Sequence, residues 1–421
     1  MAHRQKKPPV AFTLLAKPAG PACNLACQYC FYLDRQQLYP ASRFRMPEEV
    51  LQAYIRQMLA CQPSREVSIS WQGGEPTLMG LDFFEHSMDV VNRYKKPYQR
   101  ITYTLQTNGT LLDDGWCSFF RKHKFLVGLS MDGTAELHNA YRLNKGGLGS
   151  FNQVRHAWDL LQEHRVDTNI LCAVHAANAS HALEVYQFFR DDLGAHFIQF
   201  IPIVERLPGI SLPANDGSHE PPGTDRSPVR QDAGLVSQRS VKPDQYGAFL
   251  VEIFDEWVRR DVGDIFIQSF DAALASWCRL PSSVCVFQQV CGSSLVLEHN
   301  GDLYSCDHFV DPAHRLGNIL EKPLSELVRS PRQRQFGLSK RTQLPKYCRN
   351  CTVRFACQGE CPRNRFTTTP DGRDGELNYL CPSYKAFFQH VDQPMRIMTD
   401  LLRRGRTPAD IMDMGRWEKS V

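Results

Sequence analysis

Three cysteines stand close together in the stretch CNLACQYCFY, with the spacing C-x3-C-x2-C: Cys23, Cys27 and Cys30. Three thiols cannot pair into disulfides without a remainder, and three are one ligand short of a closed tetrahedral metal site. Either a fourth ligand comes from far along the chain, or the fourth position stays open for chemistry. An iron–sulfur cluster with one exposed iron would explain the missing ligand.

Eight further cysteines follow in the later part of the chain, enough for two complete four-thiolate sites: Cys285, Cys291, Cys306, Cys348, Cys351, Cys357, Cys361 and Cys381. The short spacings among them suit zinc as well as an iron–sulfur cluster, so spacing alone leaves both metals open. The other four lie inside helix or strand patterns, where we expect small buried apolar side chains: Cys61, Cys117, Cys172 and Cys278.

The composition is that of an ordinary globular protein, with 421 residues, 42% of them apolar and 22% charged. A net charge of +4 predicts neither a nucleic-acid groove nor attraction to an anionic membrane. The basic start followed by VAFTLLA resembles a signal peptide, but Lys17-Pro18 interrupts the apolar run, which also suits a buried strand. We therefore expect a cytoplasmic protein whose thiols stay reduced and bind metal.

Strand-like and helix-like runs alternate from residue 10 to 204. This alternation predicts parallel strands with crossover helices, as a barrel or an open sheet. Helical patterns cover 47–60, 81–96, 181–193 and, later, 246–261. The expected strands cover 10–18, 66–74, 101–109, 125–133, 167–175 and 196–204.

Polar residues follow three of these strands in succession: Gln72 to Glu75, Gln106 to Gly109, and Ser130 to Gly133. Asn-Gly and Asp-Gly pairs also favour ordinary turns, so each segment alone says little. Active sites of parallel barrels and open sheets gather at the carboxyl ends of the strands. Three polar ends in a row therefore predict a site there.

Two more segments have a distinct character. Residues 206–241 are rich in Pro, Gly, Ser, Asp and Arg, which predicts a flexible insertion or linker. The stretch 293–310 indicates a β-hairpin around Asn300-Gly301.

The cysteine motif followed by an aromatic residue, early in a strand–helix chain, resembles the radical S-adenosylmethionine superfamily. GGEP at 73–76 is similar to the segment that holds the cofactor's amino group in that superfamily. The eight later cysteines resemble the SPASM extension, which carries two auxiliary [4Fe–4S] clusters. The resemblance implies a partial (β/α)6 barrel in an α/β fold with a smaller C-terminal cluster-binding domain. The expected division is a barrel at 1–205, the linker at 206–241, connecting helices at 242–280, the SPASM domain at 281–390 and a helical tail at 391–421.

Within the superfamily, the chain is most similar to the anaerobic sulfatase-maturating enzymes. The similarity lies in CFYL, WQGGEPTL, LQTNGTLL, GLSMDG, HNAYR and Cys306-Asp307-His308. It implies S-adenosylmethionine and three [4Fe–4S] clusters as cofactors. Cys23, Cys27 and Cys30 would hold the first cluster. The resemblance groups the later ligands as Cys285, Cys291, Cys306 and Cys361 for one auxiliary cluster, and Cys348, Cys351, Cys357 and Cys381 for the other.

The implied reaction is oxidation of a Cys or Ser side chain of a sulfatase to Cα-formylglycine. Asp307 would be the base that takes the substrate proton, on the return strand of the hairpin; Asp271, in a helical pattern, is a competing acid. The resemblance assigns S-adenosylmethionine binding to Tyr29, Gly74, Glu75, Ser130, Arg142 and, for the adenine, Ile201. It assigns the substrate peptide pocket to Tyr32, Gln72, Gln106 and Asn108.

The implied partners are an unfolded sulfatase polypeptide and an electron donor of the flavodoxin or ferredoxin type, with no nucleic acid and no membrane. The main alternative is a SPASM enzyme that modifies another ribosomal peptide. Many such enzymes carry a leader-recognition domain, for which the roughly nine residues before the first strand are too few. A non-catalytic zinc or electron-transfer protein would leave GGEP and the open three-cysteine motif unexplained.

Overall fold

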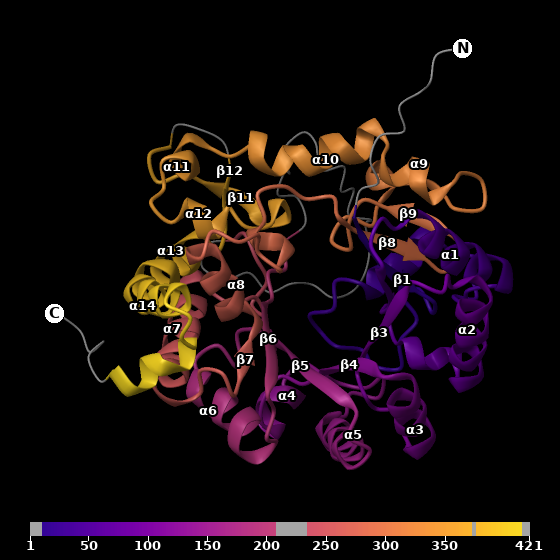
Figure 1. The fold of residues 1–421 in the computed structure, drawn as a ribbon, viewed down its shortest axis with the longest axis horizontal. Coiled ribbons are helices and arrows are strands. Elements are labelled where there is room, and N and C mark those ends of the chain that lie inside the picture. Colours follow the sequence, from indigo (N-terminus) through magenta and orange to yellow (C-terminus); the bar gives the residue numbers. More distant parts are fainter. Residues whose placement is uncertain (1–10, 208–233, 373–375, 415–421) are drawn as a thin grey trace.

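The computed structural model describes residues 11–207, 234–372 and 376–414. Its centre is an arc of parallel strands in sequential order, which confirms the predicted α/β partial barrel (Figure 1). All six predicted strands are present, and a short seventh strand continues the arc beside β6. The strands are β1 (Thr13–Lys17), β2 (Glu66–Trp71), β3 (Arg100–Thr107), β4 (Phe125–Ser130), β5 (Asp167–Val174), β6 (Phe197–Pro202) and β7 (Phe266–Ile267).

Amphipathic helices cover the outer side of this arc (Figure 1). In α1, buried residues recur at helical spacing, as with Leu51, Ile55 and Met58, so one apolar stripe faces the sheet. The helices are α1 (Glu48–Cys61), α2 (Leu81–Tyr94), α3 (Asp114–His123), α4 (Ala135–Asn139), α5 (Phe151–Glu163) and α6 (Ala182–Gln187), which continues as a π-helical turn, η3 (Phe188–Asp192). Two 3₁₀ turns, η1 (Leu33–Leu38) and η2 (Pro76–Met79), lie in the loops after β1 and β2.

The predicted hairpin is present as β8 (Ser294–Glu298) and β9 (Asp302–Tyr304), joined through Gly301 with φ at +89°. It is not confined to a separate domain. β8 pairs in parallel with β1, and β10 (Arg315–Asn318) follows β9. The result is one ten-stranded sheet that runs from the C-terminal part of the chain into the barrel.

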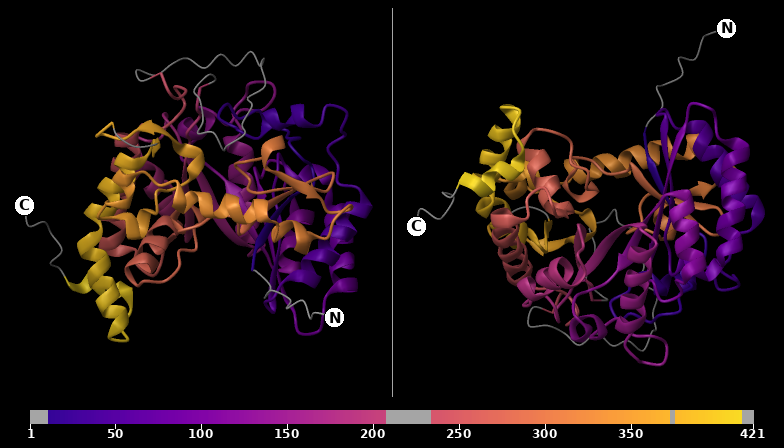
Figure 2. Two further views of the ribbon diagram at one scale, coloured as in Figure 1. Left: turned by 90° about the horizontal axis from the view of Figure 1, so that it is seen from above. Right: turned by 60° about the horizontal axis from the view of Figure 1, so that its bottom comes forward.

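Helices of the C-terminal half lie on both sides of the hairpin. Figures 1 and 2 show α10 along one edge of the molecule, with α13 and α14 next to α7. The elements are α7 (Pro243–Arg260), α8 (Gln268–Trp277), η4 (Cys285–Phe287), η5 (Pro312–His314), α9 (Leu324–Val328), α10 (Pro331–Thr342), α11 (Lys346–Arg349), α12 (Arg354–Cys357), η6 (Pro362–Asn364), β11 (Arg365–Thr368), β12 (Glu376–Asn378), α13 (Cys381–His390), α14 (Asp392–Arg403) and η7 (Pro408–Met414).

Most of the predicted linker, 208–233, lies outside the described residues. The part that follows it is packed against the barrel. Arg206 forms a β-bridge with Val236, and Arg239 forms an ion pair with Glu205 at 2.8 Å. Val236 and Ser240 are buried, so residues 234–241 belong to the folded body. In the described part of the chain, no helix is long and apolar enough to cross a membrane.

Candidate active site and cluster-binding sites

The first cysteine group lies in the loop that follows β1, at the carboxyl end of the sheet. Burial raises the pKa of Cys23 to about 12 and that of Cys27 to about 11, and Cys30 adds to both shifts. Three thiols packed this closely disfavour bare thiolates, whereas a bound metal replaces their protons. A bridge between Leu25 and Asn144 anchors the loop to the barrel.

Glu75 of the GGEP segment is completely buried and joins two strand ends. Its carboxylate accepts hydrogen bonds from the backbone N–H and hydroxyl of Thr77 at 3.0 and 2.7 Å, from the Thr107 hydroxyl at 2.8 Å and from the Asn108 N–H at 2.7 Å. Protein donors thus occupy both carboxylate oxygens. The side chain thus joins the ends of β2 and β3, and its contact with the cofactor stays a prediction.

Gly74, the residue before Glu75, lies directly against the first-cluster loop. Its backbone N–H donates to Gly20 O at 2.8 Å, and a Cβ at Gly74 would be only 2.1 Å from Ala22 O. Any side chain would push the two loops apart. The predicted cofactor segment is therefore held next to the predicted cluster.

Asn108, expected to line the peptide pocket, contacts the first-cluster loop. Its amide nitrogen donates to Asn24 Oδ1 at 2.9 Å and lies 3.7 Å from Cys23 Sγ. Its Oδ1 accepts from the backbone N–H and hydroxyl of Thr110 at 3.0 and 2.7 Å. Both ends of the amide are engaged, which favours positioning of the loop over contact with a peptide.

Two residues predicted to bind S-adenosylmethionine meet at a third residue, Asp132. Arg142 donates from Nε and Nη2 to the Asp132 carboxylate at 2.8 and 3.1 Å, and the Tyr29 hydroxyl donates at 2.5 Å. Ala173 N–H donates to the same carboxylate at 2.9 Å. Burial acts to raise the pKa of Asp132, but the Arg142 guanidinium and His175 together outweigh it and hold the pKa well below the usual range. Asp132 thus fixes both side chains at the ends of β4 and β5.

Ser130, at the end of β4, is connected to the neighbouring strand. Gln106 Nε2 donates to Ser130 Oγ at 3.1 Å, which joins a predicted substrate residue to a predicted cofactor residue. Ile201 lies one residue before the end of β6 and is 39% exposed, so it is accessible at the same edge of the sheet.

Asp307 lies in a turn three residues beyond the end of β9, so the expectation that it sits on the return strand was wrong. The pairing of β8 with β1 places this turn beside Lys17, whose Nζ is 2.6 Å from Asp307 Oδ1. Burial opposes ionisation, but Lys17, together with His308 and Arg35, outweighs it and lowers the pKa of Asp307. Lys17 also donates to Gln72 Oε1 at 3.3 Å and lies over the Tyr32 ring at 4.2 Å.

The competing acid is on a different element. Asp271 lies on the exposed face of α8, as its helical pattern predicted. The protein around it removes enough water to raise the pKa of its carboxyl to about 6. The structure places Asp307, and not Asp271, next to the other predicted site residues.

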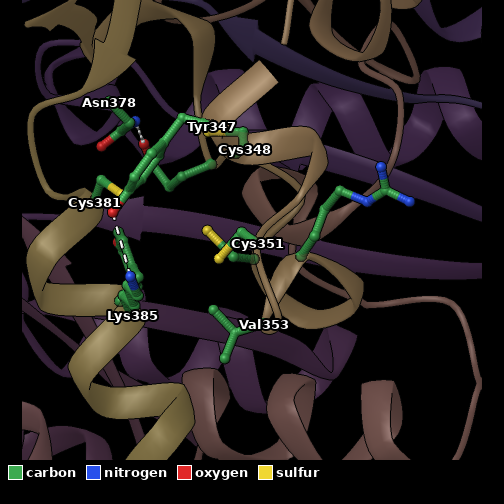
Figure 3. A pocket seen from close by; sticks show the side chains of 12 residues that line it. Tyr347, Cys348, Cys351, Val353, Asn378, Cys381 and Lys385 are labelled. Atoms are coloured by element: carbon green, nitrogen blue, oxygen red, sulfur yellow. Dashed lines mark hydrogen bonds between the residues drawn. The ribbon is translucent and has the colours of Figure 1, made fainter. Parts of the chain in front are cut away.

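The eight later cysteines form two spatial groups. Burial raises the pKa of Cys306, and Cys285 and Cys291 raise it further, while Cys361 is similarly affected by Cys306 and Cys291. The members of the second group affect one another in the same way, and they line a single cavity (Figure 3): Cys348, Cys351, Cys357 and Cys381. This division is the one that the resemblance implied.

The cavity of the second group has a polar rim. Tyr347 and Lys385 lie on the same side of it, with Lys385 Nζ donating to the Tyr347 hydroxyl at 3.2 Å (Figure 3). Glu360 and Asn378 line its inner side. A cavity with four thiols and few other donors fits a thiolate-bound iron–sulfur cluster or zinc, and it does not fit Mg²⁺ or Ca²⁺, which prefer oxygen ligands.

Two residues of this site went unrecognised in the sequence: Lys17 and Asp132. In the sequence Asp132 stands out only as part of a polar strand end, because its partner Arg142 is ten residues away, across a helix. Lys17 was treated only as an interruption of an apolar run. The feature that could have identified Lys17 is a charged residue at the end of an otherwise buried strand.

The fold, the three-cysteine loop and the two later thiol groups define a radical S-adenosylmethionine protein with a C-terminal cluster-binding region. Family models agree: the radical SAM superfamily matches residues 18–189, and an iron–sulfur cluster-binding domain, SPASM, matches residues 285–352.

More specifically, the chain belongs to the anaerobic sulfatase-maturating enzymes. It is 43% identical to the serine-type enzyme of Bacteroides thetaiotaomicron, over 95% of this chain and 94% of the relative. It is 34% identical to a cysteine-type enzyme of Clostridium perfringens, over 91% and 96% of the two chains.

A solved structure agrees with this family. Native anSMEcpe with bound AdoMet and Cp18Cys peptide superposes with a TM-score of 0.79 at 33% identity, covering 93% of this chain and 99% of that one. Streptococcus suis SuiB, at 16% identity and a TM-score of 0.56, shares the fold.

Proposed function

We propose that this chain oxidises a Cys or Ser side chain in a sulfatase polypeptide to Cα-formylglycine. The observation that carries the proposal is the position of Asp307, a partly exposed carboxylate that follows a thiol of the auxiliary group and contacts the barrel through Lys17. Membership in a family whose relatives are named as serine-type and cysteine-type maturating enzymes supports the same reaction.

The oxidation removes one hydrogen atom from Cβ, one proton from the hydroxyl or thiol, and one further electron. When bound at a reduced [4Fe–4S] cluster, S-adenosylmethionine supplies the 5′-deoxyadenosyl radical that takes the hydrogen atom. Asp307 accepts the proton. The thiols around Cys306, the neighbour of the base, would hold an auxiliary iron–sulfur cluster that could accept the electron. A Ser substrate yields the aldehyde directly, whereas a Cys substrate yields a thioaldehyde that water converts to the aldehyde with release of H₂S.

The chain's own residues position these reactants. Arg142, fixed by Asp132, has its Nη1 left to bind the carboxylate of S-adenosylmethionine. Ser130 and Gln106 join the cofactor side of the site to the peptide side. Gln72, held through its carbonyl oxygen by Lys17, has its Nε2 left to donate to the peptide backbone.

We propose three [4Fe–4S] clusters, one in each cysteine group. Three groups of three, four and four thiols support this number, because an iron–sulfur cluster takes thiolates at these spacings. We further propose a flavodoxin- or ferredoxin-type electron donor and a cytoplasmic location, where thiols remain reduced.

The deciding experiment is anaerobic incubation of the reconstituted protein with S-adenosylmethionine, a reductant and peptides containing a C-x-P-x-R or S-x-P-x-R stretch. Mass spectrometry of the peptides should find formylglycine in at least one of them. The production of 5′-deoxyadenosine with both peptides unchanged would refute the proposed function and favour another peptide substrate.

A further inference from the structure

Lys17 is a buried cation in the wall of the site. The residue is 1% exposed and stands at the last position of β1. Burying an ammonium group away from water is costly unless partners compensate its charge and its hydrogen bonds. An apolar residue would otherwise be expected at such a position in a parallel strand.

The partners of Lys17 are residues that the proposed reaction uses. Its Nζ forms an ion pair with Asp307 at 2.6 Å, donates to Gln72 Oε1 at 3.3 Å and lies 4.2 Å from the centre of the Tyr32 ring. These three residues come from the turn after β9, the end of β2 and the loop after β1. One lysine thus joins the predicted base to two residues predicted to hold the peptide.

A second carboxylate, that of Glu298, holds the Tyr32 ring in place. Glu298 is the register partner of Lys17 in the β1–β8 pair and is completely buried. The Tyr32 hydroxyl donates a hydrogen bond to Glu298 Oε1. The aromatic ring beneath the ammonium group is therefore held at its far end by the strand that also leads to Asp307.

We propose that Lys17 is a positioning residue for the oxidation, one that orients the Asp307 carboxylate and the Gln72 amide toward the substrate. The inference rests on the proposed function. The ion pair engages Oδ1 of Asp307 and thereby directs Oδ2 to the substrate hydroxyl or thiol. The contact with Gln72 Oε1 directs the amide nitrogen to the peptide. A single ammonium group thus sets the distance between proton acceptor and peptide.

Loss of Lys17 should separate two events that are normally coupled. Hydrogen abstraction depends on the cofactor residues around Asp132, which Lys17 does not contact. Proton removal depends on the orientation of Asp307. We therefore expect Lys17→Met to form 5′-deoxyadenosine with the peptide present while its yield of formylglycine per 5′-deoxyadenosine falls by roughly ten-fold or more, a smaller loss than the roughly 10²- to 10⁴-fold expected when the base itself is removed.

The test compares this yield, the KM for the peptide and the iron content in wild type, Lys17→Met and Lys17→Arg. Arg keeps the positive charge and is expected to recover part of the coupling. The matched control is Arg190→Met, which breaks another partly buried ion pair, with Glu256 and Asp261, between η3 and the end of α7. The control should lose stability but keep the wild-type yield.

A wild-type yield in Lys17→Met, or an equal loss of yield in Lys17→Arg and Lys17→Met, would overturn the proposal. If Lys17→Met binds less iron than wild type, the same measurements are made on Lys17→Gln. Loss of iron in Lys17→Gln as well would show that Lys17 is structural and would also overturn the proposal. A wild-type protein that forms no formylglycine would count against the proposed function itself, which separates the two failures.

Discussion

The side-chain amide of Gln106 lies over Gly128 on the neighbouring strand: a Cβ at Gly128 would be 2.0 Å from Gln106 Oε1 and 3.3 Å from Asn169 Oδ1. The two residues are register partners in the β3–β4 pair. The missing side chain at Gly128 thus provides the space in which Gln106 reaches Ser130. The conformation of Gln106 depends on a glycine that plays no chemical part.

Gly128→Ala should therefore displace Gln106 while the barrel stays folded, because the end of a flexible side chain can move. We expect the KM for the peptide to rise several-fold and the iron content to stay at the wild-type level. Peptide titrations with Gly115→Ala as control should show the difference, since Gly115 lies in helix α3, where Ala is the better helix former. An unchanged KM in Gly128→Ala would mean that Gln106 does not contact the peptide.

Asp307→Asn should keep both the clusters and S-adenosylmethionine cleavage, yet form little formylglycine. The amide has the shape of the carboxylate but does not accept a proton at neutral pH. A loss of roughly 10²- to 10⁴-fold in the rate of formylglycine formation is expected. Asp271→Asn, which alters the competing acid on α8, should keep the wild-type rate; the reverse outcome would assign the base to Asp271.

Asp132→Asn should weaken the binding of S-adenosylmethionine and leave the iron content unchanged. Arg142 keeps the pKa of Asp132 far below the usual value of about 3.9, so the ion pair contributes its full stabilisation above that pH. That contribution is lost only as the pH falls through the lower, folded-state pKa. Equilibrium binding measured at neutral pH should detect weaker affinity in the variant, whereas wild-type affinity would exclude a positioning role for Asp132.

Replacing Cys23, Cys27 and Cys30 together by Ala should remove about a third of the iron and all cleavage of S-adenosylmethionine. Replacing Cys348 and Cys351 by Ala should also lower the iron by about a third, but some cleavage should persist because the first group is intact. Iron and acid-labile sulfide analysis of anaerobically purified protein measures both changes. If the wild-type protein contained zinc in place of iron in the group that includes Cys348 and Cys351, the three-cluster proposal would be contradicted.

The strands, the crossover helices and the hairpin could all be predicted from sequence, because periodicity and turn residues are local signals. The contact between Lys17 and Asp307 could not, since it depends on β8 pairing with β1, and nothing local in either strand specifies the partner. The hydrogen bonds of Glu75 and Asn108 to other loops could not be predicted for a similar reason. Motifs name the residues, but only the folded chain shows whether a polar group faces a ligand or another residue.

The β1–β8 pairing also bears on how the protein is assembled. Thr13 and Ser294, which hydrogen-bond to each other across this pair, are 281 residues apart in the chain. A contact of such long range forms late, and until then β1 keeps one edge unpaired. The first cysteine loop can therefore fold while the chain is still being synthesised, but the base reaches it only after β8 has been added. A chain that is truncated before β8 would present the radical-generating half of the site without the carboxylate that completes the oxidation.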